Sequence, residues 1–192
     1  MTHDSGPEPS DLLEANSEII ERAKRVTLLM LDVDGVLTDG KIYYGNYGDE
    51  LQSFDAQDGM GMELWRQAGF SSVILSGRRS PMTIRRAKEM RVTKVFQGIK
   101  DKEKIYSEIL KELGKSDEEI CFIGDDLIDI PLLSKVGLAV GVPNAIAEVK
   151  QRAHYITEHW GGRGAVREVV DLVLKSKEMW QALMRKIQRR KE

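Results

Sequence analysis

The sequence predicts a doubly wound α/β domain, in which helices cover both faces of a parallel β-sheet in a Rossmann-like arrangement. Three observations support this fold class. Short apolar runs recur along the chain, segments with helical spacing separate them, and charged motifs follow several of the apolar runs. Alternation of strands and helices favours a parallel sheet, because each helix returns the chain to the edge where the previous strand began. The length of 192 residues suits one well-packed domain.

The composition is typical of an ordinary soluble protein, with 41% hydrophobic and 31% charged residues. A formal net charge of −2 gives no reason to expect binding to nucleic acid or to a membrane. No apolar run approaches the roughly 20 residues that span a bilayer, and Met1–Pro9 lacks the order of a signal peptide. The single cysteine, Cys121, leaves no internal disulfide, and we expect a buried thiol in a cytoplasmic protein.

Three parts of the chain are expected. Residues 1–25 form a leader that is flexible at first and helical from Asp11 to Arg25. Residues 26–174 form the main domain, which opens with the four apolar residues Leu28–Leu31, a pattern typical of a strand buried on both faces. Residues 175–192 form a helical extension with a basic end, which is either a solvated helix end or a contact with another subunit or an anionic surface.

A β-hairpin is expected behind the first strand. Residues 41–44 and 50–54 are rich in β-formers, and the turn-rich residues 45–48 separate them. Two interpretations remain open: a flap over a crevice at the end of the first strand, or a plain surface hairpin.

From Met62 onward helices and strands alternate. Glu119 lies three residues after Ser116, the spacing of a helix capping box, but a strand follows too soon, so we predict a turn there. Strands are predicted at 72–75, 94–96, 120–123, 138–140 and 155–156, and helices at 62–67, 80–90, 100–113, 127–135, 145–152 and from 165 to about 189.

Four charged or polar motifs follow predicted strands. Since the carboxyl ends of parallel strands meet at one edge of a sheet, we expect these motifs to lie together. They are Asp32-Val33-Asp34-Gly35, Ser76-Gly77-Arg78, Lys102 at the start of a helix, and Gly124-Asp125-Asp126-Leu127-Ile128-Asp129.

The chemistry of these motifs suits phosphoryl transfer. Several carboxylates without a histidine cluster favour a hard cation such as Mg²⁺ over zinc. A serine hydroxyl, a glycine turn and the lysine suit a phosphate, and one aspartate could attack phosphorus while another acts as acid and base.

Each residue also has a structural interpretation. Ser76 could cap a helix, Lys102 could belong to a solvated helix face, and Asp125 could begin a turn. Four such features in this order, each placed after a strand, are better explained by one site.

In this order the motifs resemble those of the haloacid-dehalogenase-type phosphatases, over about Val26 to Leu174. The resemblance implies that Asp32 is the nucleophile and Asp34 the general acid and base. It implies a Mg²⁺ ion held by the Asp32 side chain, the Asp34 backbone carbonyl and the Asp125 side chain. It also implies that Ser76 and Lys102 bind the phosphoryl group around the Gly77 turn, with Asp126 and Asp129 in supporting positions.

The chain is similar to the capless subgroup of this family, because only the hairpin and single helices or strands fit between the motifs. The motifs Asp58-Gly59-Met60-Gly61, Gln97-Gly98 and Gly161–Glu168 add a resemblance to members that act on eight-carbon sugar acid phosphates. This implies a role in lipopolysaccharide synthesis, a homotetramer, and a glycine–arginine segment that covers its own or a neighbour's site. Arg78 and Arg163 are then expected to pair with the carboxylate of the substrate.

Three alternatives remain. The substrate is a related nine-carbon nonulosonate 9-phosphate, or the chain is a non-catalytic relative. A phosphoryl-receiver domain also clusters acids on an α/β sheet, but its acids occur in a different order and without a hairpin. We assign no role to the histidines, His3, His154 and His159.

Overall fold

The computed structural model describes residues 9–189. The residues of the predicted flexible leader before Pro9 lie outside this range. Helix α1 (Pro9–Arg25) confirms the predicted helix and begins two residues earlier. It packs against α7 (Ala165–Ser176), and Ala23 in its last turns is fully buried. No helix in the described part of the chain is both long enough and apolar enough to cross a bilayer.

A six-stranded parallel sheet forms the centre of the molecule, as the sequence predicts. Its middle strands consist almost wholly of buried residues, which explains their continuous apolar runs. In spatial order the strands are β5 (Lys94–Gln97), β4 (Ser71–Ser76), β1 (Leu28–Leu31), β6 (Ile120–Gly124), β7 (Leu138–Gly141) and β8 (Tyr155–Ile156).

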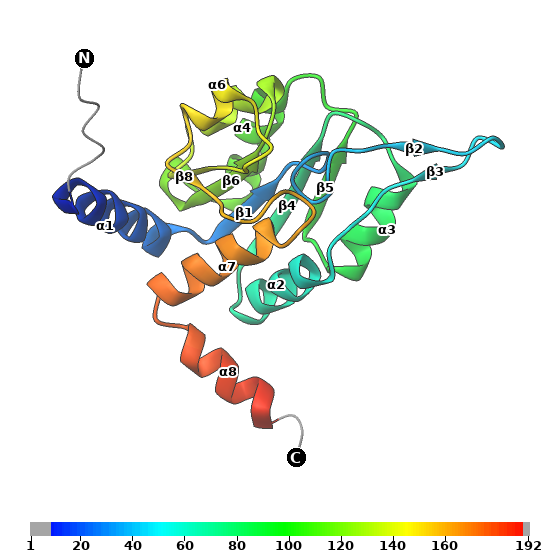
Figure 1. Cartoon of the computed structure of the whole chain (residues 1–192). Helices are drawn as coiled ribbons and strands as arrows, with labels where there is room; N and C mark the ends of the chain where they lie inside the picture. The colour runs from blue at the N-terminus through cyan, green and yellow to red at the C-terminus, as the bar shows by residue number, and fades with distance from the viewer. Residues whose placement is uncertain (1–8, 190–192) are drawn as a thin grey trace.

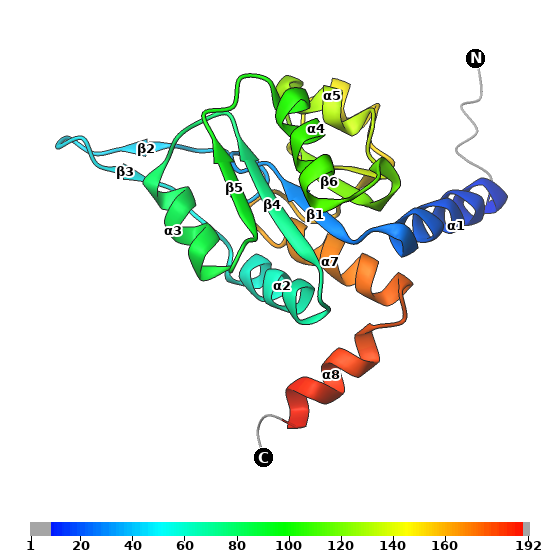
Figure 2. The ribbon, with the colours of Figure 1, turned by 180° about the vertical axis from the view of Figure 1, so that it is seen from behind.

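Helices cover both faces of this sheet, which confirms the doubly wound fold (Figures 1 and 2). On one side lie α2 (Ala56–Gln67), α3 (Pro81–Glu89) and α7; on the other lie α4 (Lys102–Leu113), α5 (Ile130–Leu133) and α6 (Ala147–Lys150). The chain moves outward from β1 through β4 to β5 and then crosses to β6 on the other side of β1. The carboxyl ends of β1 and β6 therefore flank the point where the winding reverses, a usual place for ligands in such sheets.

Helix α2 begins at Ala56, six residues before the predicted start at Met62. Asp55 caps it by accepting a hydrogen bond from the backbone N–H of Gln57. Gly59 and Gly61, which precede the predicted start, lie inside the helix, and Gly61 faces α7. A Cβ at Gly61 would lie 3.0 Å from the Cα of Arg167, so glycine lets the two helices approach closely.

Two predicted helices are broken in the structure. Residues 127–135 form a 3₁₀ turn, η2 (Leu127–Asp129), followed by the short α5, because the Asp129 carboxylate accepts the backbone N–H groups of Asp125 and Asp126. The long C-terminal helix is divided into α7 and α8 (Trp180–Arg189), with a break at Glu178, which has a φ of 59°. Residues after Ser116 form a short 3₁₀ helix, η1 (Asp117–Glu119), in place of the predicted turn. The capping box that the prediction set aside is present, since Glu119 accepts the backbone N–H of Ser116 at 3.2 Å.

The predicted hairpin is present and projects from the body of the molecule (Figure 1). Its paired strands, β2 (Tyr43–Tyr44) and β3 (Glu50–Leu51), are shorter than expected, and an isolated bridge between Thr38 and Phe54 closes its base. The tip is turned to solvent, and Tyr47 is 98% exposed.

Asp58, in α2, caps the N-terminus of α7. Its Oδ1 accepts the backbone N–H of Arg167 at 2.9 Å, at a helix start where Gly164 supplies no side chain. The side chain is buried, its other oxygen has no partner among the described residues, and burial raises its pKa to about 6 from 3.8.

The raised pKa of Asp58 predicts how the stability of the protein depends on pH. An acid whose pKa is raised by folding binds its proton more tightly in the folded state. The contribution of Asp58 to the free energy of unfolding should therefore fall as the pH rises from about 4 to about 6, and stay constant above pH 6. Asp58→Asn keeps an acceptor oxygen without the charge. The free energy of unfolding of the variant, minus that of the wild type, should rise by about 2–3 kcal/mol between pH 4 and pH 6. Urea unfolding at several pH values measures this difference. Parallel pH curves for the two proteins would contradict this account.

Candidate active site

The ends of β1 and β6 bring the first and last sequence motifs together. Leu31 is paired with Ile123, and the backbone N–H of Asp32 donates to the Ile123 carbonyl at 3.0 Å. This register places Asp32 beside the turn that carries Asp125. Carboxylate oxygens of Asp32, Asp125 and Asp129 lie within 4.8 Å of one another, as expected for motifs that follow neighbouring parallel strands.

Lys102 connects this acidic cluster to the first turn of α4. Its ammonium group donates to Asp32 Oδ1 at 2.5 Å and to Asp129 Oδ1 at 2.6 Å. The lysine is 2% exposed, so the interpretation of Lys102 as part of a solvated helix face is wrong. Asp101, the residue before Lys102, caps α4 by accepting the backbone N–H of Lys104, and so places Lys102 at the first position of the helix.

Three carboxylates lie around this one ammonium, which donates to two of them, and burial together with the shortage of positive charge raises the pKa of Asp32 and of Asp125. Burial raises the pKa of Asp32, and the charge of Asp129 adds to this effect while Lys102 opposes it. Burial and then the charges of Asp32 and Asp129 raise the pKa of Asp125 to about 8. For Lys102, burial alone would lower the pKa, but the two carboxylates outweigh it and raise the pKa. The cluster lacks positive charge when its acids are ionised.

The donor set fits a divalent cation. Asp125 Oδ1 is buried and has no hydrogen-bond partner among residues 9–189, and such an atom is costly unless something binds it. All donors are oxygens, which Mg²⁺ prefers. Gly35, with a φ of 91°, makes room for this carboxylate, since a Cβ there would lie 2.0 Å from Asp125 Oδ2. The structure thus brings the expected ligands Asp32 and Asp125 together. Asp129, which was expected only in a supporting position, has a carboxylate oxygen within 4.8 Å of both.

The Ser76-Gly77-Arg78 turn borders the cluster from β4, the strand on the other side of β1 from β6. Ser76 is buried, and its Oγ accepts the backbone N–H of Arg78 at 3.2 Å. The segment after β5 supports the Ser76-Gly77-Arg78 turn, because the backbone N–H groups of Gly98 and Ile99 donate to the carbonyls of Arg78 and Ser76. The hydroxyl, the turn and Lys102 therefore lie at the same edge of the sheet, as expected of a phosphate site.

The Asp34 side chain makes contacts that the sequence does not indicate. Its Oδ1 accepts from Gln52 Nε2 at 2.7 Å, and its Oδ2 accepts from Arg78 Nε at 2.8 Å. Arg78 also donates to Glu50 at 3.0 Å. Glu50 and Gln52 belong to the hairpin, so the hairpin reaches the site, as the flap interpretation proposed. Their two-residue spacing places them on one face of an extended segment, but sequence alone does not say which face.

Arg163 lies apart from the other predicted substrate residues. It is exposed and lines a cavity of about 260 Å³ with Lys41, Asn144 and Trp160. Among the described residues its side chain forms no hydrogen bond or ion pair with Arg78 or the acidic cluster, and neither lines this cavity. The glycines beside it pack tightly on the loop after β1: a Cβ at Gly161 would lie 1.7 Å from the Gly35 carbonyl oxygen. The role predicted for Arg163 stays a prediction.

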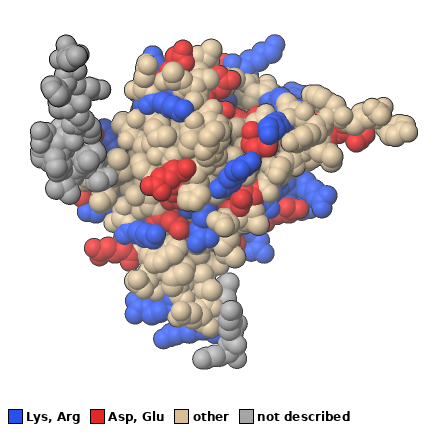
Figure 3. All heavy atoms as spheres, viewed as in Figure 1, with Lys and Arg blue, Asp and Glu red and all other residues tan. Residues whose placement is uncertain are grey.

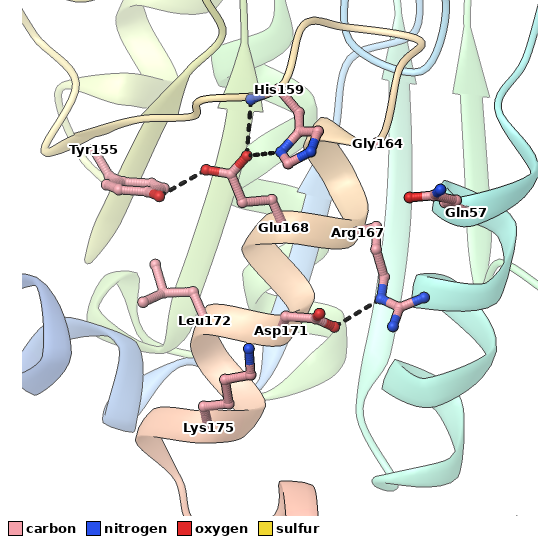
Figure 4. A pocket seen from close by; sticks show the side chains of 9 residues that line it. All are labelled: Gln57, Tyr155, His159, Gly164, Arg167, Glu168, Asp171, Leu172 and Lys175. Carbon is pink, nitrogen blue, oxygen red and sulfur yellow. Dashed lines mark hydrogen bonds and ion pairs between the residues drawn. The ribbon is translucent and has the colours of Figure 1, made fainter. Parts of the chain in front are cut away.

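A larger cavity of about 690 Å³ lies beside α7, away from the acidic cluster (Figure 4). Several of its polar side chains are paired with one another: Glu168 accepts from Tyr155 at 2.7 Å and lies 2.6 Å from His159 Nδ1, and Arg167 donates to Asp171 at 2.8 Å. Neither the acidic cluster nor Lys102 lines this cavity. On the face in Figure 3, acidic and basic side chains are interspersed, which agrees with the low net charge.

Comparison with known proteins agrees with this geometry. Residues 83–168 match the model of the haloacid dehalogenase-like hydrolases. The 3-deoxy-D-manno-octulosonate 8-phosphate phosphatase KdsC of Yersinia pestis is 44% identical over 157 residues, which are 82% of this chain and 84% of that protein.

Solved structures are similar as well. The phosphatase of the same name from Moraxella catarrhalis, in complex with magnesium ion, phosphate ion and a KDO molecule, superposes with a TM-score of 0.87 at 38% identity. The match covers 89% of this chain and 98% of that one. A putative HAD superfamily (subfamily III A) hydrolase from Legionella pneumophila gives a TM-score of 0.91 at 38% identity, over 94% of this chain and 99% of that one.

Proposed function

The chain belongs to the haloacid dehalogenase-like hydrolases, and on this basis we propose that it hydrolyses 3-deoxy-D-manno-octulosonate 8-phosphate to the free sugar acid and phosphate. It is a phosphoric monoester hydrolase, and its proposed product serves lipopolysaccharide synthesis. The observation that carries the proposal is the cluster of Asp32, Asp125 and Asp129 around the buried Lys102, at the point where the winding of the sheet reverses.

Asp32 is the proposed nucleophile. Its Oδ1 is held by Lys102, so the carboxylate has a fixed orientation at the end of β1, and its other oxygen is the one proposed to attack phosphorus. The P–O bond to the sugar breaks as the bond to Asp32 forms, which gives an aspartyl-phosphate. Lys102 has three N–H donors and uses two of them on carboxylates, so the third, with Ser76, is available to a phosphoryl oxygen.

Asp34 is the proposed general acid and base. It gives a proton to the oxygen that leaves with the sugar and then takes one from the water that hydrolyses the aspartyl-phosphate. Its side chain is 27% exposed, which leaves it accessible to both sugar and water. When bound by Asp32, Asp125 and the backbone carbonyl of Asp34, Mg²⁺ supplies positive charge that offsets the carboxylates and the phosphoryl oxygens.

Arg78 is proposed to bind the carboxylate of the sugar acid, since a planar guanidinium pairs with a carboxylate through two N–H groups. Arg78→Ala should raise the KM for the sugar acid phosphate about tenfold to a hundredfold, the usual range for a lost charge-assisted hydrogen bond. The KM for an aryl phosphate, which has no carboxylate, should change much less. Steady-state kinetics with both substrates tests this, and Arg79→Ala, an exposed neighbour, is the matched control. Equal effects on both substrates would argue against the assignment.

A homotetramer in the cytoplasm is part of the proposal. The exposed apolar side chains of the hairpin, Tyr44, Tyr47 and Leu51, support association between subunits, because such clusters are usually covered. The mass of the protein in solution, by light scattering, tests the oligomeric state; a monomer would contradict it. The single buried cysteine suits a reducing compartment.

The decisive experiment measures phosphate release from 3-deoxy-D-manno-octulosonate 8-phosphate, a nonulosonate 9-phosphate and an aryl phosphate, with Mg²⁺ and with a chelator. We expect strong preference for the eight-carbon substrate and loss of activity on chelation. Preference for the nine-carbon substrate would keep the mechanism and change the substrate. No release from any of the three would favour a non-catalytic relative.

A further inference from the structure

Asp34 is held from two sides, and only one of its partners is proposed to bind substrate. Gln52 donates to Oδ1 at 2.7 Å and Arg78 to Oδ2 at 2.8 Å. An acid that must reach the leaving oxygen needs one of its oxygens free. Under the proposed function, on which this inference rests, the substrate carboxylate competes for Arg78 and so releases Oδ2.

The other partner, Gln52, is itself fixed by the body of the domain. Its Oε1 accepts the hydroxyl of Ser80 at 3.0 Å, which turns its Nε2 toward Asp34. Ser80 is 2% exposed, and Gln97 at the end of β5 pairs with its backbone N–H and carbonyl, at 3.3 and 3.1 Å. The amide of Gln52 therefore has one orientation, set by residues that touch neither phosphate nor metal site.

We propose that Gln52 is a positioning residue that holds Asp34 toward the leaving group when Arg78 turns to the substrate. A neutral carboxamide does not form an ion pair with the incoming sugar acid, so its bond to Asp34 persists. One oxygen of Asp34 then stays bound to Gln52 and the other faces the scissile bond. The hairpin thus orients the general acid through Gln52.

Gln52→Ala tests this inference. With p-nitrophenyl phosphate the leaving group needs no proton, so phosphorylation of Asp32 should persist, whereas hydrolysis of the aspartyl-phosphate needs a base in the right place. We expect kcat for the sugar acid phosphate to fall about tenfold to a hundredfold, with KM changed less than about threefold. For the aryl phosphate kcat should fall less, because Arg78 still holds Asp34 when the substrate has no carboxylate. Phosphorylated protein should accumulate in the variant and not in the wild type, as measured by mass spectrometry after an acid quench.

Two further variants separate positioning from folding. Gln52→Lys keeps an N–H donor at a similar reach but adds a charge that pairs with the sugar acid, so it should restore activity with the aryl phosphate and not with the sugar acid phosphate. Ser53→Ala changes the next residue, which is exposed, and should behave as wild type. An effect of Gln52→Ala on KM for the sugar acid alone, no excess of phosphorylated protein, or no recovery in Gln52→Lys with the aryl phosphate would overturn the inference. Failure of the wild type to release phosphate from either substrate would overturn the proposed function, and the inference with it.

Discussion

Replacing Asp32 with asparagine should abolish phosphate release while leaving the domain folded. An amide is not a nucleophile toward phosphorus, and loss of the nucleophile lowers kcat by about a thousandfold or more in comparable enzymes. Without Mg²⁺, the Asp32 variant should be at least as stable as the wild type. Three carboxylates share Lys102, so the variant relieves repulsion and keeps the pair between Lys102 and Asp129 at 2.6 Å.

Two measurements check the Asp32 prediction together. Phosphate release gives the loss of activity, and thermal unfolding with and without Mg²⁺ should show a melting temperature that is equal or higher without the metal and gains less from it. Asp49→Asn is the control, because it makes the same change of charge at an exposed position in the hairpin. Residual activity of the Asp32 variant above about a tenth of the wild type would exclude Asp32 as nucleophile.

Replacing Lys102 with methionine should destabilise the fold as well as remove activity. The ammonium is fully buried between Asp32 and Asp129, and methionine fills a similar volume without the charge. Breaking a buried ion pair by removing one partner typically costs about 3–5 kcal/mol, because the remaining charges stay buried and unpaired. For a domain of this size that corresponds to a fall in melting temperature of about 10 °C.

Mg²⁺ should recover part of the stability lost in the Lys102 variant, since a divalent cation offsets the same carboxylates. Thermal unfolding over a Mg²⁺ titration measures both effects. Lys104→Met is the matched control, because Lys104 lies exposed in the same helix and should change the melting temperature little. A Lys102 variant as stable as the control would show that the lysine is not what balances the cluster.

Local patterns in the sequence predicted the sheet and most helices. The run Leu28–Leu31 is buried throughout and forms β1 with the predicted bounds, because an apolar run of this length leaves few alternatives. The prediction was wrong about the start of α2 and about the break between α7 and α8. Gly61 is tolerated inside α2 because α7 packs against it, and the break before α8 at Glu178 has no clear signal in the apolar pattern.

The sequence by itself determined the edge of the sheet at which the chemistry lies, because every motif follows a strand and parallel strands end at one edge. It did not determine which charged groups pair there. Only the tertiary structure shows that Lys102 bridges Asp32 and Asp129, that Gln52 and Arg78 hold Asp34, and that Arg163 lies elsewhere. The positions of the strands along the chain follow from hydrophobic patterning within short segments. A hydrogen bond between residues 18 or 44 positions apart depends instead on how separate elements pack.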